Sequence, residues 1–308
     1  MIRDFLTGTY IFPLAILLGF LFPALAEGKE FLLIPIIIVM LSLSLKDLAF
    51  TRFFERPSPT TIRLVAMSYV LLTGMTALGA IFMVQSVPYT NAMLMFALMP
   101  PAILVVSLSY LYDGDMKEAF TAEVLTYLAA LIIIPGASYL LFRDVVQPFK
   151  LFESVALVIL LPLFLSRLVR YVDQQVYKLK KENIKIAITF LVGSSAFIII
   201  GVNRELLFTD LRDLILVGVL IVLLRFGIGT LVFMLTKNAD RKMRPLYVLF
   251  ATLKNGNAAA AFTVLLFSEQ ALVPFAMNAV IDPFYLIFTE WLLRDPKKTK
   301  EGKRSPII

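Results

Sequence analysis

Four ionisable residues lie deep inside long apolar stretches of the sequence, where a charged side chain is energetically unfavourable. They are two acids and two bases: Glu123, Asp282, Arg225 and Lys254. A charge at the centre of a bilayer costs about 2.5–3.5 kcal/mol on insertion scales, so such residues usually face a protein interior or an aqueous pathway. We expect them to line a substrate or ion pathway. The alternative is that they form ion pairs that only fix helix packing.

A proline pair interrupts one of these apolar stretches. Pro100 and Pro101 follow each other in the middle of the run. Two prolines remove two backbone donors, clash with the preceding turn, and move the residue before each of them out of the α region. Carbonyl groups freed in this way are tolerated at membrane depth where protein covers them or where they line a cavity. We therefore expect a broken helix here. A simple proline kink is the alternative.

A second stretch is interrupted by polar residues that are typical of turns. Lys254 is followed by Asn255, Gly256 and Asn257, and then by four alanines. Asn and Gly favour turns, and small residues let helices approach closely. This pattern predicts a second broken helix whose polar groups belong to the pathway. The alternative is a polar patch that holds helices together.

The composition shows which elements must position these residues. Hydrophobic residues make up 59% of the 308 residues, and the mean hydropathy is +0.86, whereas a soluble domain is roughly 45–50% apolar. The chain has no Cys and no His, which excludes thiolate metal sites and imidazole bases. We therefore expect no intramembrane enzyme, no bound metal and no cofactor.

Ten apolar runs are long enough to be membrane-spanning helices, which predicts an all-α polytopic membrane protein. They cover residues 9–25, 31–50, 62–84, 89–112, 116–142, 150–169, 185–202, 213–236, 244–268 and 271–293. Most of the 29 Lys and Arg residues fall on the face that holds both termini. By the positive-inside rule, both termini are then cytoplasmic in a cell (inner) membrane. This distribution explains the basic character without a nucleic-acid partner.

The two interruptions lie about half a chain length apart, and so do Glu123 and Asp282. The chain thus divides into two five-helix halves, residues 1–147 and 148–295, followed by a basic cytoplasmic tail, residues 296–308. An odd number of spans per half makes the second half inverted. Inverted repeats whose broken helices meet at the midplane are a recurring plan of secondary transporters.

At these motifs the sequence resembles the bile acid:sodium symporter family. The segments that carry the resemblance are IVMLSLSLKD (38–47), ALMPPAILVVSLSYLYDGD (97–115), KNGNAAAA (254–261) and ALVP (271–274). Auxin efflux carriers share part of the first-half pattern. The resemblance implies a panel domain of helices 1, 2, 6 and 7 and a core domain of helices 3–5 and 8–10. It also implies that the discontinuous helices 4 and 9 cross.

This sequence departs from the family at the positions that the resemblance assigns to sodium ligands. Val105, Val106 and Ala119 stand at three of them and offer no side-chain oxygen, and Lys254 lies where an acid is expected. Our hypothesis is that Lys254 replaces a bound cation and pairs with Glu123, although pairing with Asp282 stays open. We therefore expect an uncoupled or proton-coupled carrier, since burial and pairing shift the proton affinity of such groups.

The function we expect is secondary transport of a small organic anion, a carboxylate or a bile-acid-like compound, by alternating access. The partners are then the anion and the lipid bilayer. A sodium-coupled symporter is one alternative, and an ion channel or a membrane receptor on the same fold is another. The sequence leaves open the substrate, the direction of transport and the oligomeric state.

Overall fold

The computed structural model describes residues 2–46, 56–102, 104–143, 146–177, 181–209 and 211–293. The structure is 85% helical, and no strand occurs in these ranges, which confirms the all-α class. The basic tail, residues 296–308, lies outside the described residues. In chain order the α-helices are α1 (Ile2–Leu21), α2 (Leu33–Ser44), α3 (Pro59–Ala66), α4 (Thr73–Met83), α5 (Val87–Leu98), α6 (Leu104–Leu111), α7 (Met116–Phe142), α8 (Pro148–Val155), α9 (Leu161–Val172), α10 (Lys181–Val202), α11 (Leu206–Thr209), α12 (Leu211–Val222), α13 (Ile228–Leu235), α14 (Arg244–Thr252), α15 (Gly256–Leu266) and α16 (Val273–Leu293).

Wider π-helical turns join several of these helices into longer rods. The turn Met67–Leu72 connects α3 to α4, Ala156–Leu160 connects α8 to α9, and Leu223–Gly227 connects α12 to α13. A further π turn, Asp173–Tyr177, follows α9. Such turns are rare in α-helices and occur frequently at functional sites. Short 3₁₀ turns cover Pro23–Leu25, Glu30–Leu32 and Glu269–Leu272.

Five helices of the described chain are long and apolar enough to cross a membrane. They are Pro59–Met83, Met116–Phe142, Phe149–Gln175, Leu211–Leu235 and Glu269–Leu293. Each falls on a span expected from the sequence. Shorter apolar helices at Glu30–Ser44, Val87–Leu98, Ile186–Val202 and Gly256–Leu266 fall on four further expected spans. Two of these short helices, α5 and α15, are parts of the two apolar runs that we expected to break.

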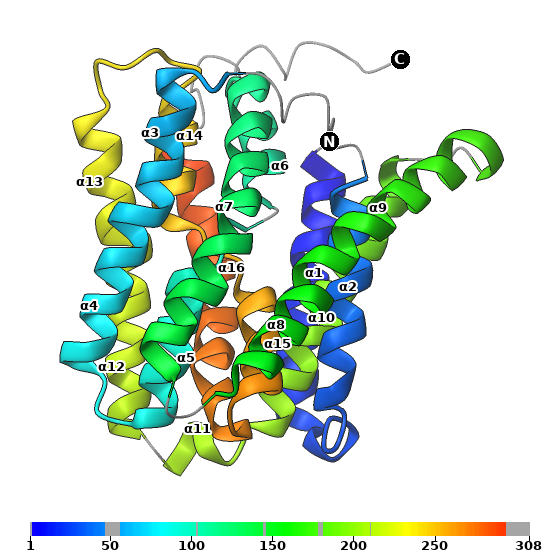
Figure 1. The fold of residues 1–308 in the computed structure, drawn as a ribbon, viewed down its shortest axis with the longest axis vertical. Helices are drawn as coiled ribbons and strands as arrows, with labels where there is room; N and C mark the ends of the chain where they lie inside the picture. The colour runs from blue at the N-terminus through cyan, green and yellow to red at the C-terminus, as the bar shows by residue number, and fades with distance from the viewer. Residues whose placement is uncertain are drawn as a thin grey trace.

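The helices form two groups that stand side by side (Figure 1). In the first group α1 packs on α10, and α2 packs on both α9 and α10. The second group contains α3 to α7 and α12 to α16, with close pairs such as α4 with α5 and α12 with α16. The start of α1 and the end of α16 lie at the same end of the molecule, the upper end in Figure 1. The segment between α13 and α14 lies at this end as well.

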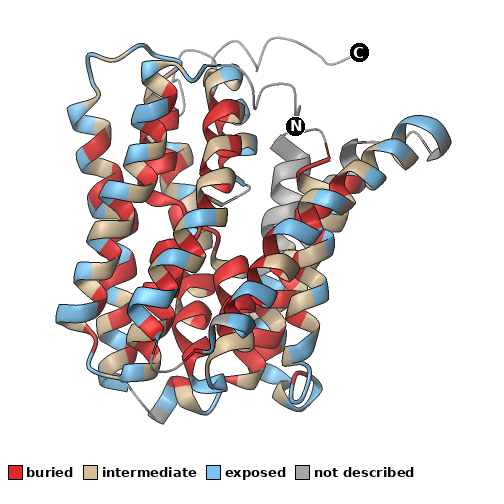
Figure 2. Cartoon of the chain, in the orientation of Figure 1, coloured by how far each residue is buried: buried red, intermediate tan, exposed pale blue. Residues whose placement is uncertain are grey.

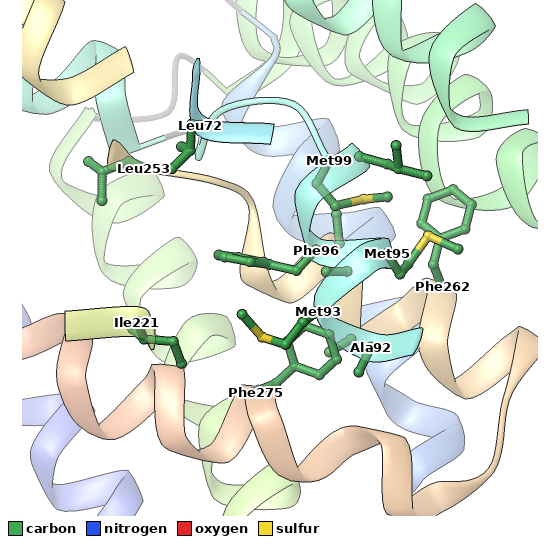
Figure 3. Packing of buried hydrophobic residues seen from close by; sticks show 14 of the residues in the cluster. Leu72, Ala92, Met93, Met95, Phe96, Met99, Ile221, Leu253, Phe262 and Phe275 are labelled. Carbon is green, nitrogen blue, oxygen red and sulfur yellow. The ribbon is translucent and has the colours of Figure 1, made fainter. Parts of the chain in front are cut away.

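Buried residues gather in the middle of the molecule, whereas the outer faces of α4 and α13 are largely exposed (Figure 2). Figure 3 shows α5 at the centre of this packing, with Met95 facing Phe262 and Met93 beside Phe275. The rings of Phe96 and Phe275 meet edge to face at 6.3 Å. Apolar packing on all sides thus fixes α5, and with it the position at which this helix stops.

Candidate functional site

The candidate site is built around two interruptions of the helical backbone. Helix α5 ends at Leu98 and α6 begins at Leu104, while α14 ends at Thr252 and α15 begins at Gly256. Met99, directly before the proline pair, has an extended conformation with ψ of 151°, as expected for a residue followed by proline. Each interruption leaves the last carbonyl groups of one helix without their usual intrahelical donors.

The two interrupted segments lie against each other. Pro101 and Lys254 form an antiparallel β-bridge. The backbone N–H of Asn255 donates to the Pro100 carbonyl oxygen at 2.9 Å, and the N–H of Ala102 contacts the Leu253 carbonyl oxygen at 3.4 Å. The side chains of Lys254 and Asn255 are buried. The breaks therefore satisfy part of each other's backbone hydrogen bonds in the protein interior, where water would otherwise be needed.

Lys254 directs its ammonium group at the end of α5. Its Nζ donates to the Met99 carbonyl oxygen at 2.7 Å and to Thr73 Oγ1 at 3.0 Å. It also lies 4.4 Å from the centroid of the Tyr69 ring, close enough for a cation–π interaction. The Thr73 hydroxyl in turn donates to the Ala97 carbonyl oxygen at 2.7 Å. The amino group of Lys254 thus caps the C-terminal end of α5, where the helix dipole concentrates negative partial charge.

Arg225 caps the C-terminal end of α14 in a similar way. Its Nη1 donates to the Thr252 carbonyl oxygen at 2.6 Å. Its Nη2 donates to Asn278 Oδ1 at 3.0 Å and lies 2.7 Å from Asp282 Oδ1. The guanidinium is 2% exposed, whereas the Asp282 side chain is 30% exposed. The second broken helix therefore also ends on a basic side chain, and this guanidinium has a carboxylate partner.

Neighbouring side chains complete the Arg225 cluster. Asn278 Nδ2 donates to Asp282 Oδ2 at 2.8 Å, so the amide holds both members of the ion pair. The Tyr285 hydroxyl donates to Thr252 Oγ1 at 2.6 Å, and the Tyr285 ring lies 5.6 Å from the guanidinium. Arg225 and Asp282 thus form an ion pair with each other, a pairing that the sequence analysis did not assign.

The expected ion pair between Lys254 and Glu123 does not form, which corrects the hypothesis. Lys254 is occupied by Met99, Thr73 and the Tyr69 ring. The alternative partner Asp282 is taken by Arg225. Glu123 lies in the second turn of α7 and is 2% exposed, and neither of its carboxyl oxygens has a hydrogen-bond partner in the described structure. The first break supplies the Met99 carbonyl oxygen as a hydrogen-bond acceptor for Lys254, so this lysine has a partner without Glu123.

The remaining predicted residues have different surroundings. Asn255 caps α15 through Oδ1, which accepts from the N–H of Ala258 at 3.0 Å, and its Nδ2 donates to the Tyr127 hydroxyl at 3.1 Å. The space beside Gly256 is tight, because a Cβ would lie 3.1 Å from Asn278 Nδ2 and this amide would have to shift by a few tenths of an ångström. Asn257 points elsewhere: its Oδ1 accepts from Ser195 on α10 at 3.0 Å.

Several residues of the site were missing from the sequence prediction, and some carried a usable signal. Tyr127 and Asn278 lie four residues from Glu123 and Asp282, so each shares a helix face with a predicted acid. Tyr69 and Thr73 offered no such signal, because they lie in a different apolar run. The π turn before α4 contains Tyr69 and ends next to Thr73. No group of three Asp or Glu side chains suited to a metal ion occurs in the described parts of the chain.

Comparison with known proteins adds one match. The family model described as "Sodium Bile acid symporter family" matches residues 31–210, more than half of the chain. The match covers the proline pair and Glu123 in the first half. No curated protein matches the chain.

Proposed function

Since this chain belongs to the sodium bile acid symporter family and is a multi-pass membrane transporter, we propose that it carries a small organic anion by alternating access. The anion is a carboxylate or a bile-acid-like compound. The proposal rests on a single observation: each broken helix ends on a positively charged side chain of the protein itself, Lys254 at Met99 and Arg225 at Thr252.

The proposed architecture is ten membrane helices in two inverted repeats of five, residues 1–147 and 148–295. The π turns support it. Met67–Leu72 interrupts the third expected span, and Leu223–Gly227 interrupts the eighth, so the same irregularity stands at the same place in each half. The ends of the described chain also lie at one end of the molecule (Figure 1), as an even number of spans requires. We propose that this end is cytoplasmic, since the basic segment between α13 and α14 lies there.

The two helix groups supply the proposed moving parts. The group of α1, α2, α8, α9 and α10 would be the panel domain, and the remaining helices, with the crossed α5–α6 and α14–α15 pairs, the core domain. The hydrogen bond from Ser195 on α10 to Asn257 on α15 connects the two groups. Rocking of one group against the other would break and remake such contacts, as in other carriers built from repeats.

The fixed cations would take over the electrostatic role of coupling ions. The C-terminal ends of α5 and α14 carry negative partial charge and free carbonyl oxygens, which is a setting that a sodium ion would suit. The ammonium of Lys254 and the guanidinium of Arg225 already occupy these carbonyl groups. In this proposal the side chains of Lys254 and Arg225 take the place of bound sodium ions, and transport does not require sodium.

Arg225 is also the best candidate to receive the carboxylate of the substrate. Its present partner, Asp282, is partly exposed although Arg225 itself is buried. A carboxylate that enters from the exposed side can replace Asp282 on the guanidinium, because both groups present the same two oxygens to the same donors. Exchange of one carboxylate for another keeps the buried cation paired throughout.

Uptake by proteoliposomes tests the proposal. Two labelled probes, cholate as a steroid acid and pyruvate as a short carboxylate, are offered with sodium or with N-methylglucamine as the only cation. We expect one of them to accumulate in the vesicles at equal rates in both media. Strict dependence on sodium would overturn the role of the fixed cations and favour a sodium symporter. Ion conductance in planar bilayers without probe uptake would favour a channel.

A further inference from the structure

Among the four ionisable residues predicted for the site, Glu123 is the one whose charged group has neither an ion-pair partner nor a hydrogen bond in the described structure. Its carboxyl group is 2% exposed, and both oxygens lack a hydrogen-bond donor. An ionised carboxylate in such surroundings loses its hydration and gains nothing in return, at a cost of several kcal/mol. A neutral carboxyl group loses far less. The geometry therefore favours the protonated form of Glu123 in this conformation.

The groups around Glu123 contain no charge that would hold a carboxylate. Its near neighbours that can titrate are the hydroxyl groups of Tyr69, from the π turn, and Tyr127, from α7 itself. The helices packed against α7 are α3, α5, α6 and α8. Their other titratable side chains are buried Tyr89, which lies on α5, and the exposed residues Arg63, Tyr110, Lys150 and Glu153.

The two tyrosines near Glu123 each contact the second interrupted segment. Tyr69 donates its hydroxyl proton to the Thr126 carbonyl oxygen at 2.9 Å, while the face of its ring meets the Lys254 ammonium. Tyr127 accepts a hydrogen bond from Asn255, which leaves its own hydroxyl proton available for another acceptor. Lys254 and Asn255 are both residues of the second break. A rearrangement of this break would thus change the surroundings of Glu123 directly.

We propose that Glu123 is a proton-binding site that couples transport to the proton gradient. In the described conformation its carboxyl group carries a proton. When the breaks rearrange and the Tyr69 ring moves, the O–H bond of the carboxyl breaks and the proton passes to water on the open side. The carboxylate that remains then faces the ammonium of Lys254. The coupling part of this inference rests on the proposed carrier function, whereas the protonation of Glu123 does not.

Infrared spectroscopy of the purified protein tests the protonation without any substrate. We expect a carbonyl band of a protonated carboxyl group at neutral pH that disappears in Glu123→Gln. The matched control is Glu118→Gln on the same helix, because Glu118 accepts hydrogen bonds from the hydroxyl groups of Ser58 and Thr61 and is satisfied as a carboxylate. This variant should keep the band. The absence of such a band from the wild type overturns the proposal, and so does its loss when sodium is added.

Uptake driven by a pH gradient tests the coupling with the same probes, cholate and pyruvate. We expect a gradient to accelerate uptake by the wild type and by Glu118→Gln, and we expect Glu123→Gln to lose this acceleration while it still exchanges probe across the membrane. If the band is present and neither probe moves, the carrier function fails and the proton site stands. If a probe moves at a rate independent of the gradient, the coupling is wrong. Should Glu123→Gln fold poorly, Glu123→Asp provides the test. We then expect a shift of the infrared carbonyl band and a shift in the pH dependence of probe uptake.

Discussion

Arg225 donates a hydrogen bond of 2.6 Å to the carbonyl oxygen of Thr252, the last residue of α14, and so caps a helix from a neighbouring span. The π turn Leu223–Gly227 contains this arginine. In an α-helix of the same sequence, the wider turn would be lost and the direction of the side chain would change. The position of the cation therefore depends on an irregularity in α12–α13 as well as on the break after α14.

Replacement of Arg225 should be costly for stability. We expect Arg225→Met to lower the free energy of unfolding by about 3 kcal/mol, the lower end of the range for buried ion pairs, because Asp282 loses its partner and is itself partly exposed. Unfolding in detergent, followed by circular dichroism, measures this. Arg212→Met on the same span is the control, since Arg212 is exposed and should change stability by less than about 0.5 kcal/mol. Equal stability of both variants would contradict the capping role.

Removal of the Lys254 ammonium should expose the Met99 carbonyl oxygen to other cations. We expect Lys254→Ala to lose about 1–3 kcal/mol of stability, because a buried acceptor is left unsatisfied. Sodium chloride should then raise the melting temperature of this variant above the value in N-methylglucamine chloride, and the wild type should not respond. Lys242→Ala, at an exposed position, is the control. A variant indifferent to sodium would show that the site at Met99 does not accept a free cation.

A pair of glycines on α4 allows a sharp test of helix packing. A Cβ at Gly79 would lie 2.2 Å from Leu220 Cδ1 on α12, whereas a Cβ at Gly74 would meet nothing within 4 Å. Gly79→Ala should therefore cost about 1–3 kcal/mol through overpacking. Gly74→Ala should be neutral or should stabilise by up to about 1 kcal/mol, since alanine favours a helix. Thermal unfolding of both variants gives the comparison, and a reversed order would refute the close approach of α4 and α12.

Asn255 should contribute as the cap of α15. In Asn255→Ala the N–H of Ala258 and the Tyr127 hydroxyl both lose a partner. The expected loss is about 1 kcal/mol, within the usual range for N-caps. Asn238→Ala, in the exposed segment between α13 and α14, is the control for removal of an asparagine. Hydrogen exchange at the start of α15 should increase only in the first variant, and unchanged protection there would argue against the cap.

Much of the fold could be predicted from the sequence, because apolar length and proline chemistry are local properties. The run 116–142 was predicted with the bounds that α7 has, and both breaks were located from Pro100, Pro101 and the Asn-Gly-Asn sequence. The charges were located as well, but their partners were not. Lys254 was matched with an acid on the basis of charge, whereas the nearest negative partial charge was a helix end created by the other break.

The contributions of Tyr69 and Thr73 could not be predicted for a different reason. Both depend on the π turn Met67–Leu72, which shifts the faces that follow it along the rod. Nothing in the sequence Met-Ser-Tyr-Val-Leu-Leu distinguishes this turn from ordinary helix, since its residues are all compatible with either form. Long-range packing decides between the two, and packing of this kind involves spans that are far apart in the chain.

The capped ends of α5 and α14 have a consequence for the proposed transport cycle, at the step in which the protein would change state without substrate. In a carrier whose helix ends are balanced by dissolved cations, loss of these cations leaves carbonyl groups with negative partial charge unsatisfied in the protein interior. Here the balancing charges cannot diffuse away. In the proposed transport cycle, the unloaded protein would therefore return without a dissolved cation, and exchange of one anion for another would need no sodium gradient.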